Sequence, residues 1–356
     1  MTNRNHQTSF ASFEYASKGR ITRREKFLGE MQKIVPWQSL LAVVEPHYPK
    51  GERGRPPIGC LRMLRLYFLQ QWYSLADEAL EDSLYDITSL REFVGIDLGR
   101  EAIPDATTLL KFRHLLEKNE LSVQMLQAIN TDLEKRGLLM RAGTIVDATL
   151  IAAPSSTKNK SGKRDPEMHS TKKGSNHYFG MKAHIGVDAQ SGVVHTVRHT
   201  PANVHDITQG ASLLHGQESD AYSDSAYRGM GKRQESQNGN GNGNGNGNGK
   251  ADAQWHIAMT PGKRKTIKAA RAQAGAVGRL ARVIDEIEQL KASIRAKVEH
   301  PFHIVKNLFR YKKVSYKGIA KNAARHTVLF ALANLVIVKK ALLKERCNHV
   351  QKPVSA

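Results

Sequence analysis

The chain has 356 residues, which is enough for about two domains and for a buried core without disulfides or a structural metal. Its 54 lysines and arginines outnumber its 33 acidic residues, and the net charge of +21 favours association with polyanions such as nucleic acid. Cys60 and Cys347 form no disulfide framework and suit a reducing compartment. We see no secretory signal, and the longest apolar stretch, Val328 to Val338, is too short to span a bilayer. We therefore exclude secreted, membrane-embedded, collagenous and wholly disordered proteins.

The first part of the chain, residues 1–58, is expected to be a basic N-terminal arm and linker, closed by a proline-rich stretch. Within it, Arg53-Gly54-Arg55-Pro56 resembles the core of an AT-hook, in which arginines enter a narrow A·T minor groove. A basic linker bounded by prolines has the same composition. Both interpretations remain open.

Residues 59–140 are expected to form a small all-α domain that binds DNA. Apolar residues repeat at helical spacing over Leu61–Trp72 and predict a first helix. Ser74 with Asp77 predicts a capping box at the start of a second helix, and Asp105 predicts the start of a third. Short helices in a basic protein suit a helix-turn-helix DNA reader, but an ordinary small helical domain fits the periodicity equally well.

Residues 141–346 alternate between strand and helix patterns, beginning with a β-branched strand at Thr144–Ile151. Pro154 to Ser175 is predicted to be a loop rich in glycine and lysine. The order of three strands, helix, two strands and helices predicts a ribonuclease-H-like α/β domain, with a mixed five-stranded sheet and flanking helices. The remaining predicted elements are strands at Tyr178–Val187, Val193–Val197, Asp220–Tyr222 and Trp255–Met259, and helices at Asp206–Leu214, Thr266–Val298 and Asn322–Lys344.

An insertion, residues 234–252, lies between the fourth and fifth predicted strands. It contains six consecutive Asn-Gly pairs, Asn238 to Gly249, and these residues have no apolar surface to bury. We therefore predict a flexible, solvated loop without a chemical role.

Three acidic residues occupy suggestive places in this predicted fold. Asp147 lies inside the first strand, Asp224 directly follows the fourth strand, and Glu299 lies near the end of a basic helical segment. A carboxylate in an apolar strand is costly unless it is paired or bound to a cation. Three converging carboxylates would repel one another and favour Mg²⁺, which accepts oxygen ligands and supports phosphodiester chemistry. Taken singly, each acid also has an ordinary structural explanation, for Glu299 a surface pair with Arg295.

The tripeptide Val-Asp-Ala occurs twice, and only one copy suits a metal site. Asp188 enters a turn at Ser191-Gly192, where aspartate is a normal hairpin residue. Asp147 instead continues into a strand, so we interpret Asp147 as the ligand and Asp188 as the turn residue.

Positive charge is concentrated around the third acid. Between Lys263 and Arg325, 17 lysines and arginines oppose four acids, a net charge of +13, and the other 293 residues share only +8. A phosphate backbone would suit this stretch, although a merely solvated basic helix is an alternative. Aromatic and cationic residues interleave near its end and favour contacts with phosphates and bases: Tyr311, Lys312, Lys313, Tyr316 and Lys317.

Seven histidines in the middle of the chain raise the alternative of a zinc site. They lack the tight ligand pairs at fixed offsets that zinc sites prefer, and no cysteine lies near them. They are His169, His177, His184, His195, His199, His205 and His215.

Several short motifs, taken in order, resemble those of DDE transposases of bacterial insertion sequences, in particular the insertion-sequence-five family. The resemblance runs from about Arg55 to Lys340, and the ordered combination is far more specific than any one motif. The motifs are Leu75–Asp82, Ile103–Leu109, Ile145–Thr149, Tyr178–His184, Ala202–Asp206, Val298–Phe302 and Tyr316–Asn322.

The resemblance implies a catalytic triad of Asp147, Asp224 and Glu299 that chelates Mg²⁺, with Mn²⁺ as an alternative ion. It also implies that cations grouped around Glu299 contact DNA near the cleaved phosphate. Two departures from the family pattern put activity in doubt: Ala226 replaces a glycine and Ala292 replaces a tyrosine. The predicted DNA contacts are Arg295, Lys306, Tyr311, Lys312, Lys313, Lys317 and Lys321.

The function expected from this resemblance is metal-dependent cleavage of DNA at element ends and strand transfer into target DNA. The expected partners are the terminal inverted repeats, the target DNA and at least one further copy of the chain, in the bacterial cytoplasm near the nucleoid and away from membranes. An impaired, DNA-binding descendant of a transposase is the alternative. A glycosidase with a carboxylate pair fits poorly, because the chain is only 6% aromatic and strongly basic.

Overall fold

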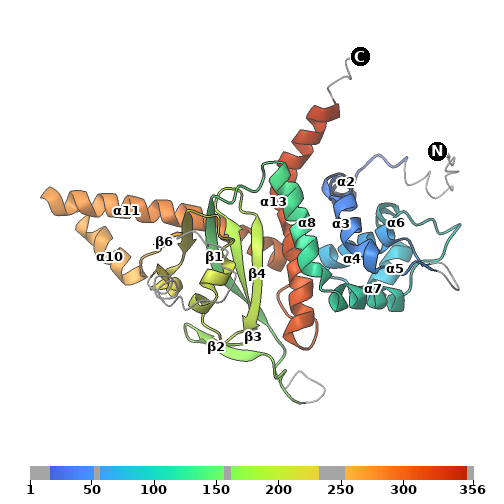
Figure 1. Ribbon diagram of the computed structural model, residues 1–356, viewed down its shortest axis with the longest axis horizontal. Helices are drawn as coiled ribbons and strands as arrows, with labels where there is room; N and C mark the ends of the chain where they lie inside the picture. The colour runs from blue at the N-terminus through green and yellow to red at the C-terminus, as the bar shows by residue number, and fades with distance from the viewer. Residues whose placement is uncertain (1–16, 52–56, 156–161, 232–252, 351–356) are drawn as a thin grey trace, which may run out of the picture. The chain divides into compact units, whose positions relative to one another are not determined.

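The computed structural model in Figure 1 describes residues 17–51, 57–155, 162–231 and 253–350. The AT-hook-like motif and the Asn-Gly pairs lie outside these ranges. The chain folds into two compact units, one formed by the described residues of Met1–Leu121 and Lys339–Ala356 and the other by Ser122–Val338.

The first unit consists of helices. Asp105 caps its last helix as predicted, since the Asp105 carboxylate accepts a 2.7 Å hydrogen bond from the Thr108 amide. The capping box predicted at Ser74 is wrong: Ser74 ends a helix in a left-handed conformation, with φ of 51°, and makes no cap to the next one. Its helices are α2 (Arg23–Ile34), α3 (Trp37–Val44), η1 (Glu45–His47), α4 (Cys60–Tyr73), α5 (Asp77–Asp86), α6 (Thr88–Val94) and α7 (Ala106–Lys118), together with the end of α13 (Ile319–Val350) from Lys339 onward.

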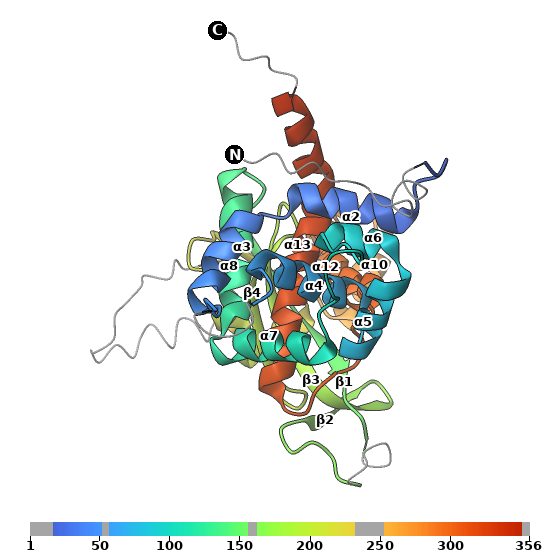
Figure 2. The same ribbon diagram turned by 90° about the vertical axis from the view of Figure 1, so that its right-hand side faces the viewer.

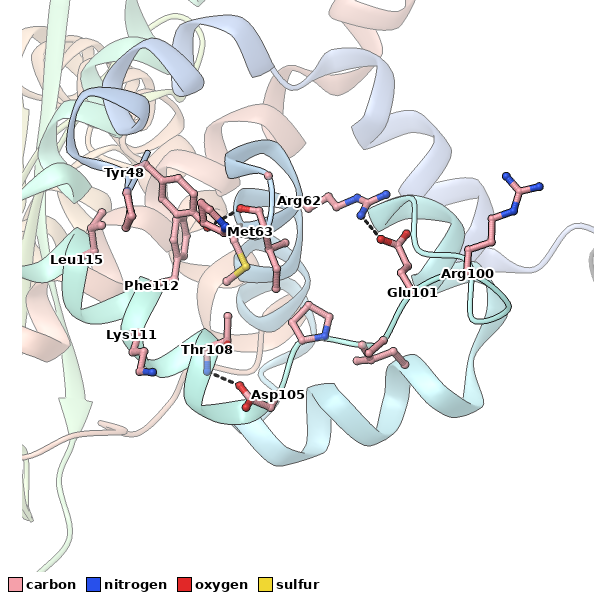
Figure 3. Close-up of a pocket in the computed structure, with 17 residues that line it drawn as sticks. Tyr48, Arg62, Met63, Arg100, Glu101, Asp105, Thr108, Lys111, Phe112 and Leu115 are labelled. Carbon is pink, nitrogen blue, oxygen red and sulfur yellow. Dashed lines mark hydrogen bonds and ion pairs between the residues drawn. The ribbon is translucent and has the colours of Figure 1, made fainter. Parts of the chain in front are cut away.

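A cavity of about 880 Å³ lies between α4, α7 and the segments that precede them (Figure 3). Met63 and Phe112 give it apolar walls, whereas Arg62, which forms an ion pair with Glu101, and Lys111 add charge. The cavity therefore has a mixed lining rather than a dry apolar interior.

The second unit is built on a mixed sheet, in the order β4-β3-β1-β5-β6. Strands β3 and β4 run antiparallel to their neighbours, and β5 and β6 run parallel to β1, so the predicted ribonuclease-H-like fold class is confirmed. The strands are β1 (Gly143–Ala152), β2 (His169–Lys173), β3 (Asn176–Asp188), β4 (Val194–Pro201), β5 (Asp220–Ser223) and β6 (Gln254–Ile257).

A sixth strand differs from the prediction. Residues 169–173, expected to be part of a loop, form β2, which pairs with the first five residues of β3. Its side chains are exposed apart from the partly covered Thr171. Residues 169–173 show no alternation of apolar and polar side chains that would distinguish this polar strand from a loop.

The helices of the second unit depart from the sequence prediction in two places. The helix expected at Asp206–Leu214 is only two short turns, because Asp206 bonds to Lys182 and Gly210 packs against Tyr227 and Met230. The single helix expected over Thr266–Val298 is broken before Gly275, whose φ of 79° is incompatible with a right-handed helix. The observed elements are α8 (Leu121–Lys135), η3 (Asp206–Thr208), η4 (Gly210–Leu213), η5 (Ser225–Tyr227), α10 (Pro261–Ala270), α11 (Gly275–Arg295), η6 (Ala296–Val298), α12 (Glu299–His303), η7 (Ile304–Leu308) and α13 (Ile319–Val350).

Helix α13 is a core helix. Its stretch Ile319–Arg346 is long and apolar enough to cross a membrane, but 67% of its most apolar window is buried within the protein. It lies beside α8 in both views (Figures 1 and 2), and the Asn334 amide donates a 2.9 Å hydrogen bond to Asn130 of α8. Asn334 also bonds both backbone groups of Val194, which ties α13 to the start of β4.

Candidate active site

Asp147 and Asp224 follow paired positions on two parallel strands. Val146 of β1 lies opposite Ser223 of β5, so the two aspartates occupy the next positions of neighbouring strands, which run about 5 Å apart. Strand β1 continues beyond Asp147, whereas β5 ends and Asp224 caps η5 by accepting a 2.8 Å hydrogen bond from the Ala226 amide. Both carboxylates are half-buried, so the sheet brings two acids together at one edge of the core.

The electrostatics of Asp147 connect it to the third acid as well. Burial, together with the charges of Asp224 and Glu299, raises the pKa of Asp147 to about 7 against the lowering effects of the Ala148 amide and Arg295. The Ala148 amide donates a 2.7 Å hydrogen bond to the Asp147 carboxylate. The Asp147 carboxyl is therefore a largely desolvated group within electrostatic reach of both other predicted acids and of Arg295.

Glu299, the third predicted acid, lies on a helix and not on a strand of the sheet. It is the first residue of α12 and follows η6, which contacts β1, and its side chain is exposed. Among the residues that the structure describes, no three acidic, histidine or cysteine side chains are close enough to hold one metal ion together. The triad thus stays a prediction, with Asp147 and Asp224 adjacent and Glu299 less tightly associated.

Two cations flank the acids. Arg295 ends α11 and interacts electrostatically with Asp147. Lys306 lies in η7, a π-helical turn of a kind often found at functional sites, and its Nζ donates a 2.6 Å hydrogen bond to Thr149 Oγ1. Burial lowers the pKa of Lys306, as do the charges of Lys173 and Lys312, whereas Glu299 opposes this effect.

The predicted basic segment after η7 lies beside the end of β1. The Ala152 amide donates a 3.3 Å hydrogen bond to the Lys312 carbonyl, and the Val314 amide donates a 2.9 Å hydrogen bond to the Ala152 carbonyl. The side chains of Lys312, Lys313, Lys317 and Lys321 are exposed.

Tyr311 differs from the other predicted DNA contacts. Its side chain is 2% exposed, and its hydroxyl donates a 3.1 Å hydrogen bond to Asn322. The ring also packs against His326. Aromatic spacing among lysines suggested a surface residue, but the structure places Tyr311 in the core, so we do not retain it as a DNA contact.

Sequence reasoning singled out Asp206 as a possible neighbour of the acids but missed three groups near the site, Lys182, Tyr227 and Lys173. Lys182 Nζ donates hydrogen bonds to the Val204 carbonyl, at 2.8 Å, and to Asp206, at 2.9 Å. The buried Tyr227 has its pKa raised by burial and by the charges of Asp206, Asp147 and Asp224. Lys173 on β2 lies near Lys306. Lys182 and Asp206 belong to motifs that carried the family resemblance, and these motifs could have identified them as site residues. No sequence feature indicated Lys173.

Two residues that raised questions in the sequence are explained by the structure. Asp188 is the turn residue, as predicted: its carboxylate accepts hydrogen bonds from the amide and hydroxyl of Ser191, at 2.7 and 2.6 Å, and from the Arg141 amide, at 3.1 Å. Ala226 lies in η5 without a positive φ, so its backbone carries no strain that the family's glycine would relieve. Ala292, which replaces the family's tyrosine, is half-buried on α11.

Two pairs of histidines form structural contacts. His199 and His326 share a 3.2 Å hydrogen bond between their rings, and burial lowers the pKa of His199 to about 3. His195 is partly buried beside Thr144 and His215, and desolvation lowers its pKa to about 3 as well. Within the described part of the chain, these residues belong to no metal-binding cluster.

Two known families match the chain. Residues 16–115 match a family described as Transposase domain (DUF772), and residues 139–335 match the Transposase DDE domain. No solved structure matches the chain. The second match extends over more than half of the 356 residues and includes β1, β5 and η6 to η7, which carry the acids and cations described above. The chain therefore belongs to the family of transposases with a DDE domain.

Proposed function

We propose that this transposase cleaves DNA at the ends of an insertion element and joins those ends to target DNA, as an insertion-sequence-five-like enzyme. Transposases of this family bind DNA and typically use divalent metals. The observation that carries the proposal is the pairing of β1 with β5, which makes Asp147 and Asp224 neighbours while Glu299 lies within electrostatic reach.

The acids suit a divalent cation. Their donors are hard carboxylate oxygens, which Mg²⁺ prefers and Mn²⁺ accepts, and a cation would stabilise the ionised form of Asp147, which burial and the two neighbouring acids disfavour. Asp147 and Asp224 would hold the metal, and Glu299 would become its third protein ligand once its carboxylate came closer to theirs than in this structure. When bound, it would polarise the scissile phosphate and increase the acidity of the attacking water or 3′-hydroxyl.

The cations around the acids would bind and orient DNA. Arg295 and Lys306 would contact phosphate near the scissile bond, and the hydrogen bond from Lys306 to Thr149 would hold its ammonium group beside β1. The exposed Lys312, Lys313, Lys317 and Lys321 would bind the backbone further from the cut.

We assign binding of the element ends and DNA cleavage to different parts of the chain. In our division, residues 59–140 bind the terminal inverted repeats, assisted by the basic arm of residues 1–58. Residues 141–346 carry out the chemistry, with 234–252 as an insertion. Two or more copies would act together in the cytoplasm, near the nucleoid, because two element ends must be joined to one target.

A donor-plasmid assay tests this function. A supercoiled plasmid with the element ends is incubated with Mg²⁺ and wild-type protein, Asp147→Asn or, as a charge-matched control, Asp132→Asn, which removes an ion pair with Arg136 on α8. We expect cleavage by the wild type and the control, and at least a hundredfold loss with Asp147→Asn, while binding to the ends persists. Binding without cleavage by the wild type would favour the impaired, DNA-binding alternative, and cleavage by Asp147→Asn would refute the site.

A further inference from the structure

Helix α11 exposes its large apolar side chains and buries small and acidic ones. Five large apolar side chains on its outer face are 46–65% exposed, and we call them the α11 seam. In an ordinary surface helix these residues would face the protein and polar residues would face water. The α11 seam consists of Val277, Leu280, Val283, Ile287 and Leu290.

The inner face of α11 is small and polar instead. Gly278 and Ala281 are buried together with two acids, Asp285 and Glu288. Asp285 forms a 2.6 Å ion pair with Arg271, which follows α10, and Glu288 accepts a 2.9 Å hydrogen bond from the Met259 amide. The contacts with α10 thus use the polar face, and α10 leaves the seam uncovered. Figure 1 shows α10 and α11 extending from the sheet as a pair of helices.

The spacing of the seam is that of a coiled coil. Leu280, Val283, Ile287 and Leu290 follow one another at intervals of three, four and three residues, which are the a and d positions of a heptad repeat. Together the seam exposes on the order of 400 Å² of apolar side chain, a patch large enough to mark an interaction surface. A heptad stripe complements another helix with the same stripe better than it complements a flat surface or a DNA groove.

We propose that the α11 seam binds the α11 seam of a second copy of this chain, as a parallel coiled coil. The arrangement is symmetric, because each helix supplies the same surface, and it places like layers together from Leu280 to Leu290. Parallel pairing also brings Glu286, at a g position, beside the e position of the second copy. Lys291 at that position pairs with Glu288 of its own chain at 2.9 Å, so its ammonium group would be shared between two carboxylates.

This inference deepens the proposed function, since a transposase that joins two ends needs two copies, and it names the surface that would hold them. The paired seams would bury roughly 800 Å² of apolar surface, below the size of a typical stable interface of about 1,200 Å² or more. We therefore expect reversible association with Kd in the micromolar range.

Sedimentation equilibrium of the full chain without DNA tests the seam apart from catalysis. We expect wild-type protein to dimerise between about 1 and 100 μM, and Leu280→Gln/Ile287→Gln to weaken the dimer at least tenfold. Lys265→Gln/Lys268→Gln, on the exposed surface of α10 outside the seam, is the control and should dimerise like the wild type. Circular dichroism would verify that helix content is unchanged, and glutamine preserves helix propensity.

Self-crosslinking tests the orientation. In a parallel pair, residue 287 of each copy shares one layer, so Ile287→Cys should form a disulfide-linked dimer under mild oxidation, whereas Gln289→Cys should not. A monomeric wild type at 100 μM, or a dimer that the double glutamine variant does not weaken, would overturn the proposal. A dimer in which Ile287→Cys stays uncrosslinked would also overturn it, whereas plasmid cleavage could proceed in each of these cases.

Discussion

Lys306 donates a 2.6 Å hydrogen bond to Thr149, which lies two residues beyond Asp147 on the same face of β1. Alternate residues of a strand share a face, so the lysine ammonium is held on the side of the sheet that carries the first acid. Residues 149 and 306 are far apart in sequence, and the bond fixes η7 against the strand. The hydroxyl thus orients a cation that would otherwise be a flexible side chain.

We predict that Lys306→Gln lowers plasmid cleavage at least tenfold, because the variant loses a cation beside the scissile phosphate. The slope of log K for end binding against log salt concentration should become shallower by about the amount expected for one lost phosphate contact. Thr149→Val should lower cleavage only a few-fold, since the ammonium remains but is less well oriented. Lys340→Gln, an exposed charge on α13, serves as the control. Normal cleavage by Lys306→Gln would show that Lys306 only ties η7 to the sheet.

The buried histidines predict acid sensitivity of the fold. Burial lowers the pKa of His195 and of His199 to about 3, whereas an unfolded histidine has a pKa near 6.5. Below pH 6.5 the unfolded chain therefore binds protons that the native chain excludes, so the free energy of unfolding should fall as the pH falls. Above pH 6.5 these histidines should have no effect. The expected loss approaches 1.4 kcal/mol per pH unit for each such histidine.

Urea unfolding between pH 7 and 5 measures this slope. The comparison is best made in an Asp147→Asn background, because the raised pKa of Asp147 gives a pH dependence of opposite sign in the same window. Adding His199→Gln should reduce the slope by about one proton. An unchanged slope would mean that His199 is protonated in the native state.

The left-handed conformation of Ser74 predicts the effect of glycine there. Ser74 has φ of 51° at the end of α4, a position where glycine carries no Cβ penalty. We expect Ser74→Gly to raise the free energy of unfolding by about 0.5–1 kcal/mol and Ser74→Ala to lower it or leave it unchanged. A capping box would give the opposite result, since both variants would lose the cap. Urea unfolding of the three proteins distinguishes the two cases.

Local sequence signals predicted much of the fold. The apolar, β-branched residues of β1 are buried on both sides of the strand, and the cap at Asp105 and the turn at Asp188 depend on side chains within three residues. These features follow from short-range chemistry. The chain order of the strands was then enough to identify the sheet.

The features that escaped prediction depend on contacts between distant segments. The lysines around Tyr311 suggested an exposed side chain, but contacts with Asn322 and His326 bury it. Strand β2 is a strand because it pairs with β3. For the candidate site, the sequence motifs identified three acids. Their relative positions depend on the register of β1 and β5 and on the turn into α12. Periodicity carries no information about such pairings.

The conformation of Ala226 predicts that restoring the family's glycine would bring no benefit. Ala226 lies in η5 without a positive φ and packs against the apolar cluster that includes Val146 and Tyr227. Ala226→Gly should therefore lower the free energy of unfolding by about 0.5–1 kcal/mol, because glycine gains freedom in the unfolded chain. Plasmid cleavage should stay within about twofold of the wild type, since the amide that bonds Asp224 is still present. If the position required a left-handed backbone, the glycine variant would instead be more stable by about 1 kcal/mol and more active.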